Sequence, residues 1–277
     1  MSHATDHDGG YVRRFDRYHR VSHGLLMASF LGLAGTGVPL LFSDQRWARW
    51  VSRAWGGFES SAFLHRVFAL VLIGVFIAHV ARLVKRVYVH KDYTIFWGPT
   101  SMVPQPQDLF DMFAHFRWFV GLGPRPRFDH FTYWEKFDYW AVFWGMLVIG
   151  GSGLMLWFPT AFAYVVPGWL FNVAMVIHGE EALLAVGFIF TIHFFNGHIR
   201  PEKFPMDTVI FTGRIPHHEL VEERAGELER LQRAGRVDAL RVGAPSEGLV
   251  LFGKTVGTIA VVVGLAIVSL IVYAVLT

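Results

Sequence analysis

The sequence predicts an all-α integral membrane protein, a helical bundle with five transmembrane helices. Of its 277 residues, 53% are hydrophobic, and the mean hydropathy is +0.38, which is too apolar for an ordinary soluble domain. Crossing the hydrocarbon core of a bilayer takes about 20 consecutive apolar residues. Five stretches meet this length, at residues 21–42, 62–84, 136–158, 170–196 and 249–276.

The sequence contains no cysteine, which limits its redox chemistry. A covalently attached haem, a cysteine-ligated iron–sulfur cluster and a disulfide are all excluded within this chain. Any redox centre of its own must be held by histidine, methionine or similar ligands. The net charge of +3 does not indicate a nucleic-acid partner.

The basic residues indicate the orientation in the membrane. They concentrate before the first span, between the second and third, and between the fourth and fifth. Cytoplasmic loops carry the excess of Lys and Arg. We therefore expect a multi-pass protein of a bacterial-type inner membrane, with the N-terminus cytoplasmic and the C-terminus outside. The polar N-terminus lacks the apolar core of a signal peptide.

The segments between the spans have their own patterns. Within the long connection 85–135, residues 107–120 read as an interfacial amphipathic helix, because the segment is short and mixes charged with aromatic residues. His115 is predicted to lie on its surface. Residues 201–248 form a charged connector with helical periodicity, expected to face solvent or a partner. The fifth helix, within 249–277, has no His or acid and is predicted to serve packing or partner docking.

Histidines recur at matched spacing in two spans. His178 and His193 are 15 residues apart in the fourth span, which leaves them about 60° from a common face and about 22 Å apart along a helix. His65 and His79 are 14 apart in the second span, about 40° off and about 21 Å apart. Ionisable residues inside a membrane segment are costly and point to function.

Two helices that offer histidines at two depths could hold two haems, each iron taking one imidazole from each helix. At the outer level, only His65 and His178 are available. At the inner level, His193 has two candidate partners, His79 by spacing and His23 by depth. Bis-histidine ligation leaves no open iron position, which disfavours oxygen or peroxide chemistry.

Four segments resemble one family, the membrane cytochrome b subunits of formate dehydrogenase and nickel–iron hydrogenase type. The resemblance covers residues 13 to about 200 and rests on FDRYHRVSHGLLMASFLGLAGTG, LHRVFALVLIG, RFDHFTYWEKFDYWAVFWG and IHGEEALLAVGFIFTIH. It implies a four-helix di-haem core over residues 1–200, here followed by a fifth transmembrane helix.

The resemblance also implies cofactors and partners. Two b-type haems would be held by His65 with His178 and by His23 with His193. Electrons would pass between the quinone pool, menaquinone or ubiquinone, and a partner subunit carrying iron–sulfur clusters or c-type haems. The step of 15 from His178 to His193 departs from the family's usual 14. His79 and His198 are additional, so a third haem could use one of them.

Further polar residues near the spans are candidates for the same site. Arg66 and Arg20 adjoin an outer and an inner histidine, and could pair with haem propionates or simply reach the interface. Glu180 and Glu181 could exchange protons with a quinone or pair with Arg66. Asn196, His198 and Arg200 could form a quinone headgroup pocket at the cytoplasmic edge, although solvated loop charges explain them nearly as well.

Two other classes of protein also place histidines in membrane helices. An intramembrane proton or ion transporter could use His and Glu as a relay. A flavin-linked transmembrane reductase also pairs histidines on two helices, but this chain has no Gly-rich dinucleotide fingerprint. A purely structural anchor leaves the matched histidines unexplained.

Overall fold

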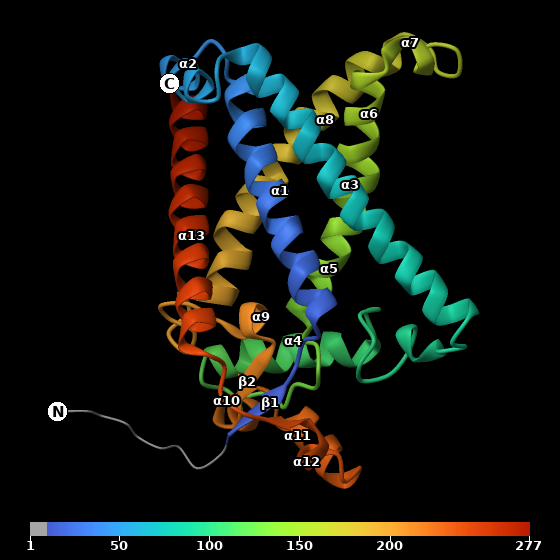
Figure 1. Ribbon diagram of the computed structural model, residues 1–277, viewed down its shortest axis with the longest axis vertical. Coiled ribbons are helices and arrows are strands. Elements are labelled where there is room, and N and C mark those ends of the chain that lie inside the picture. The colour runs from blue at the N-terminus through green and yellow to red at the C-terminus, as the bar shows by residue number, and fades with distance from the viewer. Residues whose placement is uncertain (1–9) are drawn as a thin grey trace, which may run out of the picture. The chain divides into compact units, whose positions relative to one another are not determined.

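The computed structural model describes residues 10–277, and helices dominate it (Figure 1). Five helices in this range are long and apolar enough to cross a membrane: Arg17–Leu41, Phe58–Tyr88, Tyr133–Trp157, Trp169–Ile199 and Glu247–Leu276. The predicted spans agree with these to within a few residues. The all-α, multi-pass prediction is confirmed at this level.

The long helices are α1 (Arg17–Leu41), α3 (Phe58–Tyr88), α8 (Trp169–Phe188) and α13 (Glu247–Leu276), with shorter helices between them. The third span is α5 (Tyr133–Gly145), a π-helix η2 (Met146–Gly150) and α6 (Gly151–Trp157) in succession. The fourth continues from α8 into two π-helices, η3 (Ile189–His193) and η4 (Phe195–Ile199).

The remaining elements are short. They are β1 (Tyr11–Arg13), α2 (Arg46–Ala54), η1 (Tyr93–Ile95), α4 (Pro106–Phe119), α7 (Pro159–Phe162), α9 (Val209–Thr212), β2 (Arg214–Pro216), α10 (His217–Glu223), α11 (Ala225–Arg233), α12 (Val237–Leu240) and β3 (Arg241–Val242). The sequence predicted α4 and the helical character of α10 and α11, but not the strands.

The chain forms two compact units. Of the described residues, the first contains 10–20, 81–140 and 209–250, and the second contains 21–80, 141–208 and 251–277. The first unit therefore holds the connections and the ends of several spans, whereas the second holds most of the apolar helix length.

The first unit contains a small antiparallel sheet in the order β2–β1–β3. Val12 of β1 lies opposite Ile215 of β2 and Arg241 of β3. Val12 and Ile215 join Val209, Leu220 and Leu228 in a buried apolar cluster. The sheet thus ties the N-terminal strand to the 209–250 segment, which is a folded part of this unit.

Buried charges surround this cluster. Arg224 donates to both carboxylate oxygens of Glu135 at 2.8 Å, in the two-pronged geometry that makes such pairs strong. Arg14 donates to Glu227 at 3.1 Å, and His130 also hydrogen-bonds Glu227. Burial alone would raise the pKa of Glu227, but His130, Arg14 and Arg224 together lower it to about 2.

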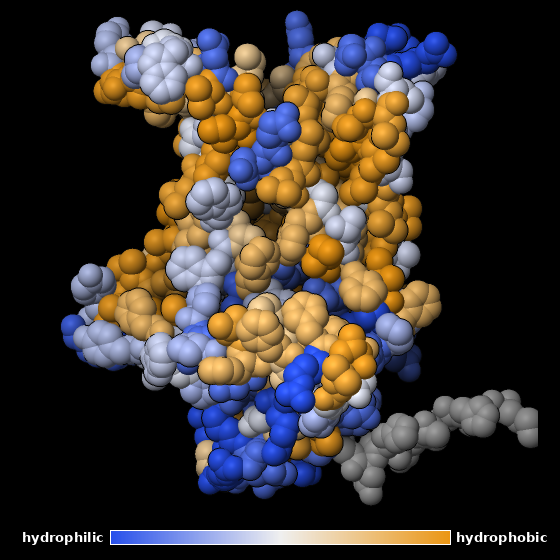
Figure 2. All heavy atoms as spheres, turned by 180° about the vertical axis from the view of Figure 1, so that it is seen from behind, coloured by the Kyte–Doolittle hydropathy of each residue, from blue (hydrophilic) through white to orange (hydrophobic). Residues whose placement is uncertain are grey.

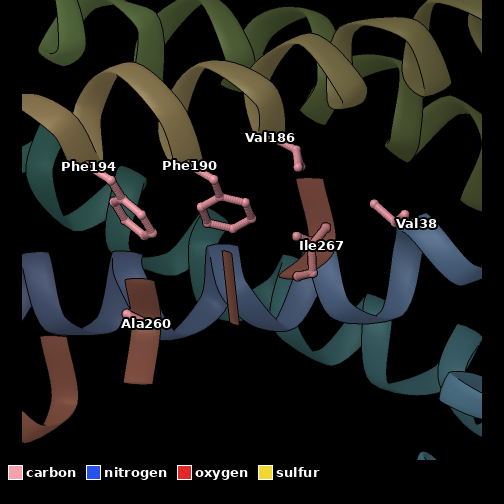
Figure 3. Packing of buried hydrophobic residues seen from close by; sticks show 7 residues of the cluster. Val38, Val186, Phe190, Phe194, Ala260 and Ile267 are labelled. Carbon is pink, nitrogen blue, oxygen red and sulfur yellow. The ribbon is translucent and has the colours of Figure 1, made fainter. Parts of the chain in front are cut away.

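The second unit has an apolar core shared by three helices. Ala34 and Val38 of α1 pack with Val186 of α8, Phe190 of η3 and Phe194, and Ala260 and Ile267 of α13 complete the cluster (Figure 3). At Gly264 of α13, an added Cβ would lie 2.6 Å from the Phe190 ring. Glycine is therefore required for this close approach of the fifth helix to the fourth.

Many other large apolar side chains of the membrane-length helices are exposed. Examples are Phe63, Leu70, Leu147, Met175 and Val262. Figure 2 shows hydrophobic side chains covering much of the surface of these helices on the face drawn. Lipid tails can cover such surfaces where water cannot, which supports a membrane location.

Candidate functional site: two facing imidazole pairs

The second unit brings four histidines together as two pairs. His65 of α3 faces His178 of α8, with ring centroids 6.2 Å apart and ring planes at 79°. His23 of α1 faces His193 of η3, with centroids 6.5 Å apart and planes at 34°. Each pair joins two different helices, and each is one of the pairs that the sequence offered.

The pairs lie at two levels along α1 and the fourth span. On α1, His23 belongs to one pair, and Thr36, 13 residues later, contacts His65 of the other. A step of 13 residues corresponds to about 20 Å along a helix axis. On the fourth span, His178 and His193 show a similar separation. The paired sites are therefore stacked through the length of the helices.

The π-helix η3 accounts for the unusual spacing in the fourth span. It covers Ile189–His193 and so ends at the histidine of the inner pair. A π-turn closes its hydrogen bond over five residues instead of four and so accommodates one extra residue. The 15-residue step can therefore still present His193 to His23, because the π-helix turns the chain back toward the shared face.

Thr36 orients the imidazole of His65. The Thr36 hydroxyl donates to the Gly32 carbonyl at 2.7 Å, so it acts as the acceptor for Nδ1–H of His65 at 3.1 Å. The proton then resides on Nδ1, and Nε2 keeps its lone pair. Partners of this kind fix the tautomer and direction of a metal-binding histidine.

His178 is oriented in the same manner from the third span. Its Nδ1–H donates to the backbone carbonyl of Ile149 at 3.0 Å, with the Ser152 hydroxyl 3.4 Å away. Ile149 lies in the π-helix η2, where the regular α-helical hydrogen bonds are interrupted. The carbonyl that this irregularity makes available sets the direction of the imidazole.

Two glycines leave space beside the outer pair. A Cβ at Gly37 would lie 2.8 Å from Cε1 of His65, and a Cβ at Gly153 would lie 2.9 Å from Cε1 of His178. Any larger residue would displace these rings. Gly35–Thr36–Gly37 and Gly151–Ser152–Gly153 are equivalent Gly-hydroxyl-Gly triplets, one in the first and one in the third span. This repeated triplet is a sequence signal for orienting residues that the histidine spacing alone did not reveal.

The distances fit a metal ion held between each pair. An imidazole nitrogen binds a transition metal at about 2 Å, and the ring centroid lies about 1.1 Å behind it, so two imidazoles on opposite sides of one ion have centroids about 6.2 Å apart. The observed values are 6.2 Å and 6.5 Å. Within residues 10–277 no group of three or more His, Asp or Glu is arranged for a metal ion. Two protein ligands per ion match haem, whose macrocycle supplies the other four.

The inner level holds a further histidine. His198 packs against Phe194, with centroids 6.0 Å apart, and its buried Nδ1 has no hydrogen-bond partner within residues 10–277. The same Phe194 ring lies 6.3 Å from the His193 ring. His79, by contrast, contacts Phe143, with ring centroids 6.2 Å apart. The geometry thus favours His23 over His79 as the partner of His193.

The outer arginine and acids lie as follows. The Arg66 guanidinium stacks over Trp157 at 5.8 Å, and Trp144 donates to Glu181 at 3.4 Å. Glu180 is exposed. Within residues 10–277, no ion pair joins Arg66 to Glu180 or Glu181. Arg66 lies instead over the Trp157 ring, and Glu181 accepts from the indole N–H of Trp144.

The inner polar residues have different surroundings. Arg20 donates through Nε to the Phe211 carbonyl at 2.7 Å, within the first unit. Asn196 and His198 lie in η4, and Arg200 ends it; all three are half-buried. They remain candidates for a polar pocket beside His193.

The position predicted for His115 is wrong. It was predicted on the surface but is 7% exposed. Its ring stacks with the rings of Trp118 and Trp134, and its Nδ1 hydrogen-bonds the Tyr133 hydroxyl at 3.1 Å. These partners come largely from a later segment, which helical periodicity within α4 cannot reveal.

No protein-family model matches this chain, and no curated protein matches it significantly.

Proposed function

We propose that this chain is the membrane cytochrome b subunit of a quinone-linked oxidoreductase complex, carrying electrons across the bilayer. The observation that carries this proposal is the pair of facing imidazoles at each of two levels, with spacings of 6.2 Å and 6.5 Å. Haem b, when bound, supplies reversible one-electron transfer. His65 with His178, and His23 with His193, would hold the two haems.

The remaining residues of the site would position ligands and handle protons. Thr36 and the Ile149 carbonyl hold the outer imidazoles with Nε2 free to bind iron. Quinone reduction takes up two protons with two electrons, so a quinone site needs polar groups beside it. Asn196, His198 and Arg200 would supply them at the inner level, and Glu180 or Glu181 at the outer one. A partner subunit with iron–sulfur clusters or c-type haems would exchange electrons at the other end.

The test is anaerobic reduction of the purified full chain by a quinol, followed through its visible spectrum. The proposal expects b-type bands that a short-chain menaquinol or ubiquinol reduces. Bands reduced by dithionite but by neither quinol would overturn the quinone link. A colourless folded protein that moves protons or ions in vesicles would favour the transporter instead.

The proton-handling residues can be tested separately. We expect Glu180→Gln or Glu181→Gln to slow quinone-linked turnover while the haem spectrum stays intact. If both variants turned over like the parent protein, the outer acids would have no proton role.

A further inference from the structure

Helix α4 has an inverted distribution of side chains. Its large apolar residues point outward, and each is more than half exposed: Leu109, Phe110, Phe113, Phe116 and Phe119, here called the phenylalanine face. Leu109, Phe113 and Phe116 recur at the i, i+4, i+7 spacing of one helix face. The buried side holds Asp108 and His115. A helix in water would show the opposite arrangement.

Polar bonds from the third span hold α4 in this orientation. Lys136 donates to both oxygens of Asp108 at 2.8 Å, and the two side chains are only 8% and 14% exposed. Tyr133 contacts His115 at 3.1 Å. Removing either charge would leave the other buried without its partner, which is strongly unfavourable. These bonds therefore hold α4 with the phenylalanine face directed outward.

These bonds also fix the level of α4. Lys136 lies three residues after Tyr133, the first residue of the span, which is a rise of about 4.5 Å. Trp140, about 10 Å along the same helix, donates to the Met102 carbonyl just ahead of α4. All these residues belong to the first unit. The helix is thus tied to the first two turns of a membrane-crossing helix, where the bilayer surface lies.

The edge of the helix suits lipid headgroups. Arg117 is exposed near the phenylalanine face, and Arg125 stacks over Trp118 at 5.2 Å. An arginine beside an apolar helix face is typical of helices that lie in the membrane interface, where its long side chain reaches the headgroups. The five side chains of the phenylalanine face themselves offer only hydrocarbon and aromatic rings.

We propose that α4 lies in the plane of the membrane interface with the phenylalanine face inserted among lipid acyl chains. The depth of such insertion is typically about 5–10 Å. The occupant of this surface is membrane lipid. This inference rests on the membrane location of the spans, and not on haem or quinone.

The absence of cysteine gives a clean test by spin labelling, because one introduced cysteine is the sole labelling site. F113C and F116C report the phenylalanine face, and Q107C reports an exposed polar position on the same helix. V262C, exposed on α13, provides a lipid reference. Each full-length variant is reconstituted in nanodiscs, and collision with dissolved oxygen is compared with collision with a water-soluble nickel chelate.

The proposal expects F113C and F116C to behave like V262C, with an oxygen-to-nickel collision ratio several-fold above that of Q107C. A ratio equal to that of Q107C would place the face in water and overturn it. Exclusion of both reagents would show coverage by protein, either a partner or a second copy, and would also overturn it. Haem content plays no part in this readout, so the result is independent of the proposed function.

Discussion

The two units bury polar groups in different ways. In the first, opposite charges meet: Arg224 with Glu135, and Arg14 with Glu227. In the second, imidazoles face each other, and the outer two hydrogen-bond through Nδ1 to a hydroxyl and a carbonyl. Charge pairs satisfy one another and complete a fold. The facing imidazoles lie at the spacing that two axial ligands of one iron would have, and the proposed haem sites rest on this spacing.

Removing one imidazole tests the second unit most directly. We expect His65→Ala or His178→Ala to abolish the outer haem and to halve the haem content, because a low-spin haem needs both axial ligands. The pyridine haemochrome assay measures the content. His79→Ala is the control on α3 and should keep both haems. If His79→Ala lost a haem and His23→Ala did not, the inner pairing would be wrong.

In the first unit, removing one buried charge should destabilise the fold. Glu227→Gln leaves Arg14 and Arg224 with less compensation in a buried site, and losing one partner of a buried pair costs about 3–5 kcal/mol. Hydrogen exchange of the β1 and β2 amides should rise accordingly, with haem content unchanged. Glu229→Gln on the same helix is the control, because its pair with Arg127 is exposed and such pairs contribute about 0–1 kcal/mol. Equal effects of the two variants would contradict the charge network.

The same residue predicts a pH dependence. The pKa of Glu227 is lowered from 4.5 to about 2, so its contribution to stability is present above about pH 4.5 and is lost as the pH falls toward 2. The protection factors of the sheet amides, which are exchange rates corrected for the intrinsic rate at each pH, should fall over this window in the parent protein, and less so in Glu227→Gln. Protection factors that stay constant in the parent protein from pH 5 to 3 would contradict the assignment.

Filling the space that Gly153 leaves beside His178 should have a smaller effect. Gly153→Ala places a Cβ 2.9 Å from the imidazole, and overpacking of this kind costs about 1–3 kcal/mol. We expect faster loss of the outer haem, measured by transfer to apomyoglobin. Gly151→Ala, two residues away, meets nothing within 4 Å and serves as the control. Identical haem loss in the two variants would show that the space beside His178 is not needed for haem binding.

The smallest change tests orientation alone. Thr36→Val keeps the shape of the side chain but removes the acceptor for Nδ1 of His65. Loss of such a partner typically weakens metal binding about 10–100-fold. The midpoint potential and dissociation rate of the outer haem should both shift, while Ser29→Ala, a buried hydroxyl on the same helix, should leave them unchanged. If the Thr36→Val protein had the same midpoint potential and dissociation rate as the parent protein, Thr36 would not orient His65.

Sequence patterns predicted what depends on local periodicity. The five apolar helices and the pairing of His65 with His178 follow from helix length and residue spacing. Residue spacing left the choice between His23 and His79 open. The family resemblance implied His23, and in the structure His23 faces His193. The π-helices were also invisible, since nothing in the local composition of 146–150 or 189–193 separates them from an α-helix.

Contacts between distant segments escaped prediction. The strands contain only two or three residues each, too few for an alternating pattern, and β1 pairs with residues some two hundred positions away. His115 was misplaced for the same reason, because Tyr133 and Trp134 bury it from another segment. The Arg14–Glu227 pair likewise joins opposite parts of the sequence.

The haem b content per polypeptide tests the central claim most directly. The full chain, purified in detergent and confirmed as helical by circular dichroism, is assayed by pyridine haemochrome against protein mass from amino-acid analysis. The facing pairs predict two haems b per chain. A folded chain that contains none would contradict the interpretation of both imidazole pairs as haem ligands.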